Sequence, residues 1–389
     1  PVIASLGMNS QRQIITVTQN GSLIVLNTDN TPYPNFPVSL SGACLGAPAI
    51  ADLNGDCTHE ILVATLNGNL HAINSATGQN IAGFPIAMIG GSQNPITVAN
   101  LDSDTSPEIV VTTSTAGYIL GYNSDASVLF QKNVGGQIKS GAVVADVNND
   151  GTKEIVVTGA TGLVHILTPA GNNLPNTPIN IGQATDCTPT VARFDGDNYA
   201  GIIFGDTNGK LHSVRADGTE SPNFPITLGG NIKISAALAD IDQDNDFDIA
   251  IPNDAGYYVI DIKRPAQSIE WGCFMGTYNR GGNIYQATPN QDQSVPAPTT
   301  RLEANFPNPF NPSTMICFEL AAPGNVTLDI YNQKGQLVRT LVDSDLPAGR
   351  HQIEWNGKDS NGNNAASGLY FYRMHSGSYS STRKMVLMK

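Results

Sequence analysis

Short apolar segments separated by polar turns fill most of this chain, and the segments are rich in β-forming residues. In one stretch they fall at residues 48–51, 60–65, 70–74 and 84–88. Asn67-Gly68, between the second and third segments, is a hairpin signal. This pattern predicts four short antiparallel strands, each too short to form a stable unit without neighbours.

The set of four strands recurs at a nearly constant interval. The first segment of each set ends at an alanine before a polar turn, and the alanines are spaced by 47, 48, 46, 47 and 47 residues, at Ala4, Ala51, Ala99, Ala145, Ala192 and Ala239. A proline opens the fourth segment at Pro37, Pro85, Pro178 and Pro225, and proline is restricted to edge strands. The repeat therefore predicts a β-propeller. We count six four-stranded blades, or seven or eight if further repeats preceded Pro1.

A second unit follows the repeats. Residues 284–300 are rich in Gln, Pro, Thr and Ser, which is typical of a linker. Beyond it, strands are predicted at 315–320, 326–331, 351–355, 369–374 and 380–387, separated by glycine-containing turns. We therefore expect an all-β chain with a propeller over residues 1–283 and an Ig-like β-sandwich over residues 301–389.

Composition excludes several classes of function. The net charge of −13 argues against binding of nucleic acid, and no apolar run is long enough to span a membrane. The five cysteines lack CxxC spacing, so we expect small buried side chains rather than a zinc site or a disulfide framework. No nucleophile elbow, P-loop or HExxH motif is present, so we expect no enzyme within these residues. Because the chain opens at Pro1 directly in a strand, we expect a fragment or a processed product.

The polar turn after each alanine is acidic, and it is the strongest chemical signal. Acids or amides occupy positions 1, 3, 5 and 9 of a nine-residue loop, where a backbone carbonyl at position 7 can join them. Calcium accepts mixed carboxylate, amide and carbonyl oxygens. The predicted metal ligands are Asp52, Asn54, Asp56, Thr58 and Glu60; Asn100, Asp102, Asp104, Ser106 and Glu108; Asp146, Asn148, Asp150, Thr152 and Glu154; and Asp240, Asp242, Asp244, Asp246 and Asp248.

Asp, Asn and Gly also make good turns without any metal. Four copies in register, each with an acid at position 9, favour Ca²⁺, with about four ions per chain. The fifth loop has Arg193 at position 1 and Gly201 at position 9, so we expect it to have lost the ion. The first loop, with Ser5, Gly7 and Asn9, is expected to have lost it too.

Two further sets of residues lie at equivalent positions of the repeats, and each has a structural and a functional interpretation. His71, His165 and His212 share one position of the third strand, where we favour packed or hydrogen-bonded histidines over zinc or catalysis. Lys139, Asp186 and Lys233 each lie six residues before the alanine of their repeat. We expect a row of ion pairs at the rim of the central channel, with a ligand-contacting patch as the alternative.

The acidic loop resembles those of FG-GAP or VCBS repeats in integrin-α-like propellers, which read DxDxDGxxD. The resemblance covers about 270 residues. It departs at Cys57, Thr105 and Asn245, where that family has glycine, and this implies weaker binding at those loops. No residue here matches the integrin ligand interface.

The second unit carries a different resemblance. Its segments NFPNPFNPST (305–314), WNGKD (355–359), ASGLYFY (366–372) and RKMVL (383–387) occur in a characteristic order. They resemble the C-terminal sorting domain of type IX secretion substrates and the related Ig-like domain of the flagellar hook-capping protein. The resemblance implies export through the type IX secretion machinery by residues 301–389, to the outside or outer surface of a Gram-negative bacterium.

Two functions fit these observations. The first is a secreted or cell-surface, calcium-stabilised module that binds a glycan or protein, or spaces other domains. The second is the accessory C-terminal part of a secreted hydrolase or lyase whose catalytic domain lies upstream of Pro1. A weaker third is an enzyme inside the propeller channel, as in some calcium-dependent polysaccharide lyases. The ligand is not identifiable from the fold.

Overall fold

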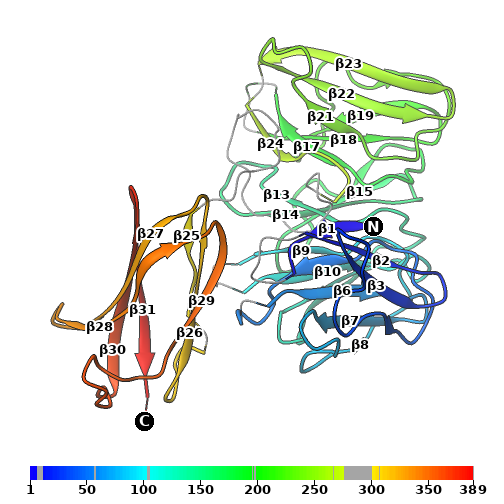
Figure 1. The fold of residues 1–389 in the computed structure, drawn as a ribbon. Helices are drawn as coiled ribbons and strands as arrows, with labels where there is room; N and C mark the ends of the chain where they lie inside the picture. The colour runs from blue at the N-terminus through cyan, green and yellow to red at the C-terminus, as the bar shows by residue number, and fades with distance from the viewer. Residues whose placement is uncertain are drawn as a thin grey trace. The chain divides into compact units, whose positions relative to one another are not determined.

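The computed structural model describes residues 1–6, 12–56, 58–102, 106–194, 196, 199–265, 267–275, 300–305 and 307–388, and these residues contain strands but no helix. The chain divides into two compact units, the larger mainly within residues 1–292 and the smaller mainly within residues 293–389 (Figure 1). The prediction of an all-β propeller followed by an Ig-like sandwich is confirmed.

Five four-stranded antiparallel sheets, the first five blades, follow one another in sequence, with the fifth extended by one further strand. Their strands are β1 (Val2–Ala4), β2 (Gln13–Val17), β3 (Ser22–Asn27) and β4 (Val38–Ser39); β5 (Ala49–Ala51), β6 (Glu60–Ala64), β7 (Asn69–Asn74) and β8 (Ile86–Ala87); β9 (Thr97–Ala99), β10 (Glu108–Thr112), β11 (Tyr118–Tyr122) and β12 (Val128–Asn133); β13 (Val143–Ala145), β14 (Glu154–Thr158), β15 (Leu163–Leu167) and β16 (Ile179–Asn180); and β17 (Thr190–Arg193), β18 (Gly201–Gly205), β19 (Lys210–Val214) and β20 (Ile226–Thr227).

The sixth blade differs from the prediction of four strands. Its described sheet has three, β21 (Ala237–Ala239), β22 (Asp246–Asn253) and β23 (Gly256–Pro265), and the next strand, β24 (Ser268–Trp271), pairs with β17 of the fifth blade. Trp271 is 1% exposed and packs into the core between the fourth and fifth blades. Burying so large an aromatic surface stabilises the return of the chain to the fifth blade.

Blades two to five bury both of their faces against their neighbours. Every residue of β6, β10, β14 and β18 is buried, which explains their nearly continuous apolar runs. Separate apolar clusters join blades two and three, three and four, four and five, and five and six. The prolines Pro37, Pro85, Pro178 and Pro225 immediately precede β4, β8, β16 and β20, which are edge strands as predicted.

The C-terminal unit is a sandwich of two sheets. One contains β25 (Arg301–Leu302), β26 (Thr314–Leu320) and β29 (Gly349–Trp355), and the other β28 (Leu337–Leu346), β27 (Gly324–Asn332), β30 (Gly368–Ser376) and β31 (Tyr379–Leu387). The buried Trp355 ring packs against Phe310 and Tyr370 between the sheets. Strand β28 was not among the predicted strands, because most of its residues are polar or exposed.

The cysteines are not all unpaired as expected. Cys317 in β26 is disulfide-bonded, so the prediction was wrong for this residue. Cys44 and Cys187 are buried free thiols, and Cys273 is a half-buried one. Cys57 lies outside the described residues.

Candidate metal-binding loops

The acid at position 9 closes each of the four predicted calcium loops through the same hydrogen bond. The backbone N–H of position 2 donates to this carboxylate from Leu53 to Glu60 (3.0 Å), Leu101 to Glu108 (2.6 Å), Val147 to Glu154 (3.0 Å) and Ile241 to Asp248 (2.8 Å). The acid stands at the start of the second strand of its blade, or two residues inside it in blade six. This shared geometry places one carboxylate oxygen against the loop in each blade.

These position-9 acids are almost completely buried. The exposed fractions are 0% for Glu60, 1% for Glu108 and Glu154, and 4% for Asp248. Burial is the main cause that raises the pKa of Glu154 to about 7; the neighbouring Asp150 and Asp146 carboxylates add to the rise, and the hydrogen bond from Val147 opposes it. A buried carboxylate beside the other oxygen donors of its loop suits a cation site.

The middle of each loop is held by its own backbone. In the fourth loop, Asp150 N–H donates to Asn148 Oδ1 (3.1 Å) and Thr152 N–H donates to Asp150 Oδ1 (2.7 Å). The second loop repeats this arrangement with Asn54, Asp56 and Thr58. These bonds order positions 3, 5 and 7. They use the single side-chain oxygen of each Asn and one carboxylate oxygen of each Asp, whose other oxygen accepts from the Asn side chain at 3.0 Å in the second loop and 2.9 Å in the fourth.

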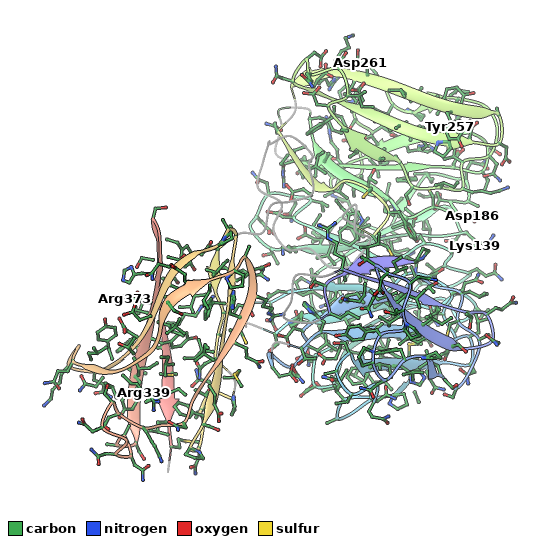
Figure 2. The ribbon with its side chains drawn as sticks, viewed as in Figure 1. Lys139, Asp186, Tyr257, Asp261, Arg339 and Arg373 are labelled. Atoms are coloured by element: carbon green, nitrogen blue, oxygen red, sulfur yellow. The ribbon has the colours of Figure 1, made fainter. Side chains whose placement is uncertain are left out.

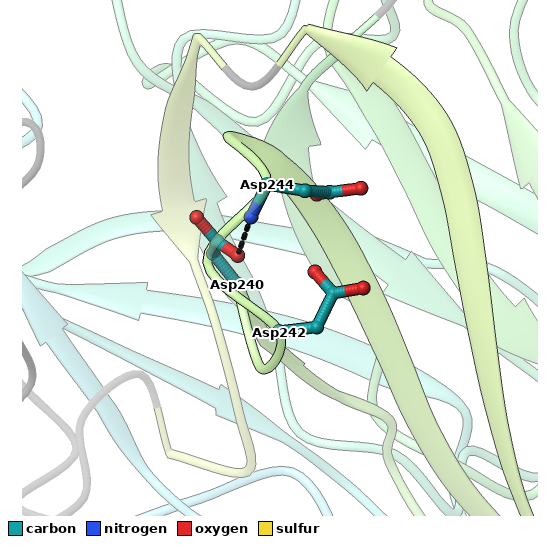
Figure 3. Close-up of side chains that lie close together, drawn as sticks. All are labelled: Asp240, Asp242 and Asp244. Carbon is teal, nitrogen blue, oxygen red and sulfur yellow. Dashed lines mark hydrogen bonds between the residues drawn. The ribbon is translucent and has the colours of Figure 1, made fainter.

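The sixth loop brings its acids closest together. Asp240, Asp242 and Asp244 each offer a carboxylate oxygen, and these three oxygens all lie within 4.8 Å of one another. Figure 3 shows them around the turn, with the backbone N–H of Asp244 donating to Asp240 Oδ1 (3.2 Å). Within the described part of the chain, the acids of the second and fourth loops do not form so tight a group.

Position 6 of the loop, where the resembled family has glycine, has a left-handed backbone in the fourth and sixth loops. Asn245, which stands where the resembled family has glycine, has a φ of 72°, and Gly151 at the same position of the fourth loop has a φ of 86°. The sixth loop thus adopts the left-handed backbone despite lacking glycine. Asp104, Cys57, Thr105, Gly7 and Asn9 lie outside the described residues.

The fifth loop contains an arginine where the four predicted calcium loops have an acid or amide. Arg193 Nη2 lies 3.7 Å from Asp146 Oδ1 of the fourth loop and also donates to the Asp146 carbonyl. On its other side, Arg193 Nε lies 3.7 Å from Glu270 Oε1 of β24. The guanidinium therefore binds to an acid of the preceding blade, a contact that the sequence did not predict.

The three repeat-equivalent histidines are buried, with exposed fractions of 4% or 5%. His212 differs from the others because Nδ1 lies 2.7 Å from Glu220 Oε1 and Nε2 lies 3.2 Å from Asp206 Oδ2. Burial lowers its pKa, but the bonds to Glu220 and Asp206 outweigh burial and the net shift is upward. Burial lowers the pKa of His165 to about 4. None belongs to a group of metal-ligating side chains within the described residues.

The rim residues pair between blades. Lys139 Nζ lies 3.2 Å from Asp186 Oδ2, and both side chains are labelled in Figure 2. Lys233 Nζ instead lies 3.5 Å from Asp254 Oδ2 at the turn between β22 and β23. This pairing agrees with the ion-pair interpretation for Lys139 and Asp186.

Comparison with known families supports both halves of the fold. A family model of the FlgD Ig-like domain matches residues 313–380. A family model of the lambda-carrageenase β-propeller domain matches residues 109–220, which run from the third blade to the fifth. A search of curated proteins found no match.

Solved structures with similar folds have low sequence identity. BamB from Moraxella catarrhalis is 14% identical, with a TM-score of 0.48 over 90% of this chain and 95% of that chain. Sqt1 from Saccharomyces cerevisiae is 14% identical, with a TM-score of 0.48 over 67% and 71%. PorZ, a surface component of the type IX secretion system of Porphyromonas gingivalis, is 13% identical, with a TM-score of 0.36 over 98% and 59%. The described residues contain no helix long and apolar enough to cross a membrane.

Proposed function

We propose that the chain is a secreted or cell-surface propeller module whose acidic loops bind Ca²⁺, and whose surface binds a glycan or protein or spaces other domains. The burial of the position-9 acids is the observation that supports this most strongly. Burying a carboxylate is costly unless a cation or sufficient hydrogen bonds compensate. The same acid is buried in four blades, beside further carboxylates and amides of its own loop.

The donor set favours calcium over other metals. At their predicted ligand positions the loops offer carboxylate, amide and carbonyl oxygens and neither thiolate nor imidazole, and such ligands suit Ca²⁺ or Mg²⁺. About four Ca²⁺ ions per chain would offset much of the negative charge that the loops concentrate. Extracellular calcium is plentiful enough to fill loops of modest affinity.

The nature of the ligand follows most directly from the match of blades three to five to the lambda-carrageenase propeller model, which favours a polysaccharide. The test is binding of the full chain to immobilised lambda-carrageenan and to a neutral glucan, with Ca²⁺ and with a chelator. Calcium-dependent retention on one of them supports a glycan module. Failure on both, with calcium binding intact, would direct the search to protein ligands.

The C-terminal unit is proposed to direct export by a type IX-like route. The match of residues 313–380 to the FlgD Ig-like model supports an Ig-like fold for this proposed sorting domain. A reporter fused to residues 301–389 should leave cells that possess the type IX machinery and stay inside a mutant that lacks it. Retention in both strains would reduce the unit to a spacer.

The carrageenase match also favours the second function, the accessory end of a secreted hydrolase or lyase. In that case catalysis would belong to a domain upstream of Pro1. Incubation of this chain with lambda-carrageenan should then release no new reducing ends or unsaturated products. A longer gene product that cleaves the polymer would support this alternative, and cleavage by residues 1–389 would contradict both functions.

A further inference from the structure

The sixth blade has an aspartate, Asp261, on its third strand, outside the acidic loop. Strand β23 is ten residues long, and it places Asp261 directly opposite Asp248 and Pro265 opposite Asp246, with a register irregularity between those pairs. Asp261 therefore lies on the strand next to the last residues of the loop. The third strands β7, β11 and β15 carry no acid.

Asp261 completes a second group of carboxylates. Asp244, Asp246 and Asp261 each offer one oxygen, and all three oxygens lie within 4.8 Å of one another. Figure 2 labels Asp261 towards one end of β23. Only Asp244 also belongs to the group formed by the loop. The other two carboxylates of the second group, those of Asp246 and Asp261, are not part of the first group.

Asp246 gives independent evidence for a ligand at this position. Its exposed fraction is 8%, and its Oδ1 atom is buried without a hydrogen-bond partner in the described part of the structure. The other loops have Thr58, Ser106 and Thr152 at this position, which carry no charge. A buried carboxylate oxygen without a donor is costly, and a cation beside it would remove that cost.

An exposed lysine supplies positive charge beside this group. Lys263 Nζ contacts Asp261 Oδ2, and its side chain is 74% exposed. One exposed ammonium offsets at most one of three carboxylates. A divalent cation would bring two charges to the centre of the group, and Lys263 could move into solvent.

We propose that Asp244, Asp246 and Asp261 bind a divalent cation of the calcium or magnesium class, in addition to any ion in the loop. Asp244 would bridge the two ions, and water would complete a coordination shell that three carboxylates leave open. The site extends the proposed use of calcium, but it stands on Asp246 and Asp261 even if the repeated loops bind nothing.

The direct test is the calcium content of the full chain after equilibrium dialysis against CaCl₂. Asp261→Asn should bind one ion fewer per chain than the wild type. Asp254→Asn is the matched control, since Asp254 lies on the same hairpin, is also paired with a lysine and is 59% exposed. It should bind as many ions as the wild type. Equal calcium content in Asp261→Asn and the wild type would overturn the proposal.

Two further variants separate this site from the loop. Asp240→Asn should remove the ion of the loop while the effect of Asp261→Asn persists in the double variant. Lys263→Gln should bind calcium several-fold more tightly, because it removes the competing ammonium.

If Asp240→Asn loses no ion but Asp261→Asn does, the loop proposal fails and this one stands. If neither Asp261→Asn nor Lys263→Gln changes calcium binding, the group is an acidic cluster neutralised by Lys263 alone. Circular dichroism of each variant verifies the fold.

Discussion

Arg193 Nη2 lies 3.7 Å from Asp146 Oδ1, so a residue of the fifth loop contacts the first acid of the fourth loop. Both side chains are largely buried, at 12% and 22% exposure. The position that would hold a calcium ligand in the fifth blade thus carries a fixed positive charge directed at its neighbour. The fifth blade thus contacts the fourth through an ion pair, at the position where the four predicted calcium loops have an acid or amide.

Replacing this arginine should have opposite effects with and without calcium. Arg193→Gln should destabilise the chelator-treated protein by about 1.5–3 kcal/mol, the usual loss for a hydrogen bond to a charged group. It should also strengthen calcium binding at the fourth loop, because a competing cation is removed. Chemical unfolding in EDTA and in CaCl₂ measures both, and a variant equally destabilised in the two buffers would contradict the competition.

The acidic loops can be tested with a matched pair of aspartates. Asp150 Oδ1 accepts the backbone N–H of Thr152 at 2.7 Å, and Asp217 Oδ1 accepts that of Thr219 at 2.9 Å, so both make the same turn. Only Asp150 belongs to a predicted calcium loop. Asp150→Ala should lower the melting temperature mainly in calcium, whereas Asp217→Ala should lower it equally in calcium and EDTA. The same calcium dependence in both variants would favour turn chemistry alone.

His165 and His212 should change stability with pH in opposite directions. The raised pKa of His212 means that its contribution is fully present below the unfolded pKa of about 6.5 and is lost as pH rises through the folded value. The pKa of His165 is lowered to about 4, so its contribution is present above about 6.5 and is lost as pH falls towards 4.

Leucine occupies the equivalent position in the third blade, as Leu120, and is therefore the natural replacement. His212→Leu should be most destabilising at acidic pH. His165→Leu should be relatively stabilising there, because it removes a neutral imidazole that resists protonation. Unfolding free energies between pH 5 and pH 9 measure the two slopes, and parallel slopes would show that the carboxylates around His212 do not hold its charge.

The return of β24 to the fifth blade can be tested through its tryptophan. Trp271→Ala should cost about 3–5 kcal/mol, because it leaves a cavity between the fourth and fifth blades. Tyr257→Ala, at a residue that is 90% exposed, is the control and should cost little. Equal effects in denaturant unfolding would mean that β24 does not pack as described.

Much of the propeller was predictable because the central strands of blades two to five are completely buried. Residues 155–157, for example, are continuously apolar, and the edge prolines precede the outermost strands. The pairing of β24 with β17 was not predictable, because Trp271 looks like the end of a sixth blade until its partner is known. Polar residues in β28 likewise made this strand hard to predict, because half of its ten residues are exposed.

The candidate sites, too, were predictable from the sequence only in part. The spacing of the acids identified the loops, and the structure adds the bond from position 2 to position 9. Two contacts escaped the sequence because they depend on register between strands or blades, namely Arg193 with Asp146 and Asp261 with Asp246. An arginine at position 1 and an acid at position 7 were the signals that could have suggested them.

The central claim is that calcium stabilises this propeller through its repeated loops. The most direct measurement is the melting temperature in excess CaCl₂ and in EDTA, together with the metal content of the purified chain. Ligands that bind only the folded state stabilise it by mass action. The account predicts a large calcium-dependent rise in melting temperature with at least about four ions per chain. An unchanged melting temperature with no bound metal would contradict it and leave the acidic loops as turns.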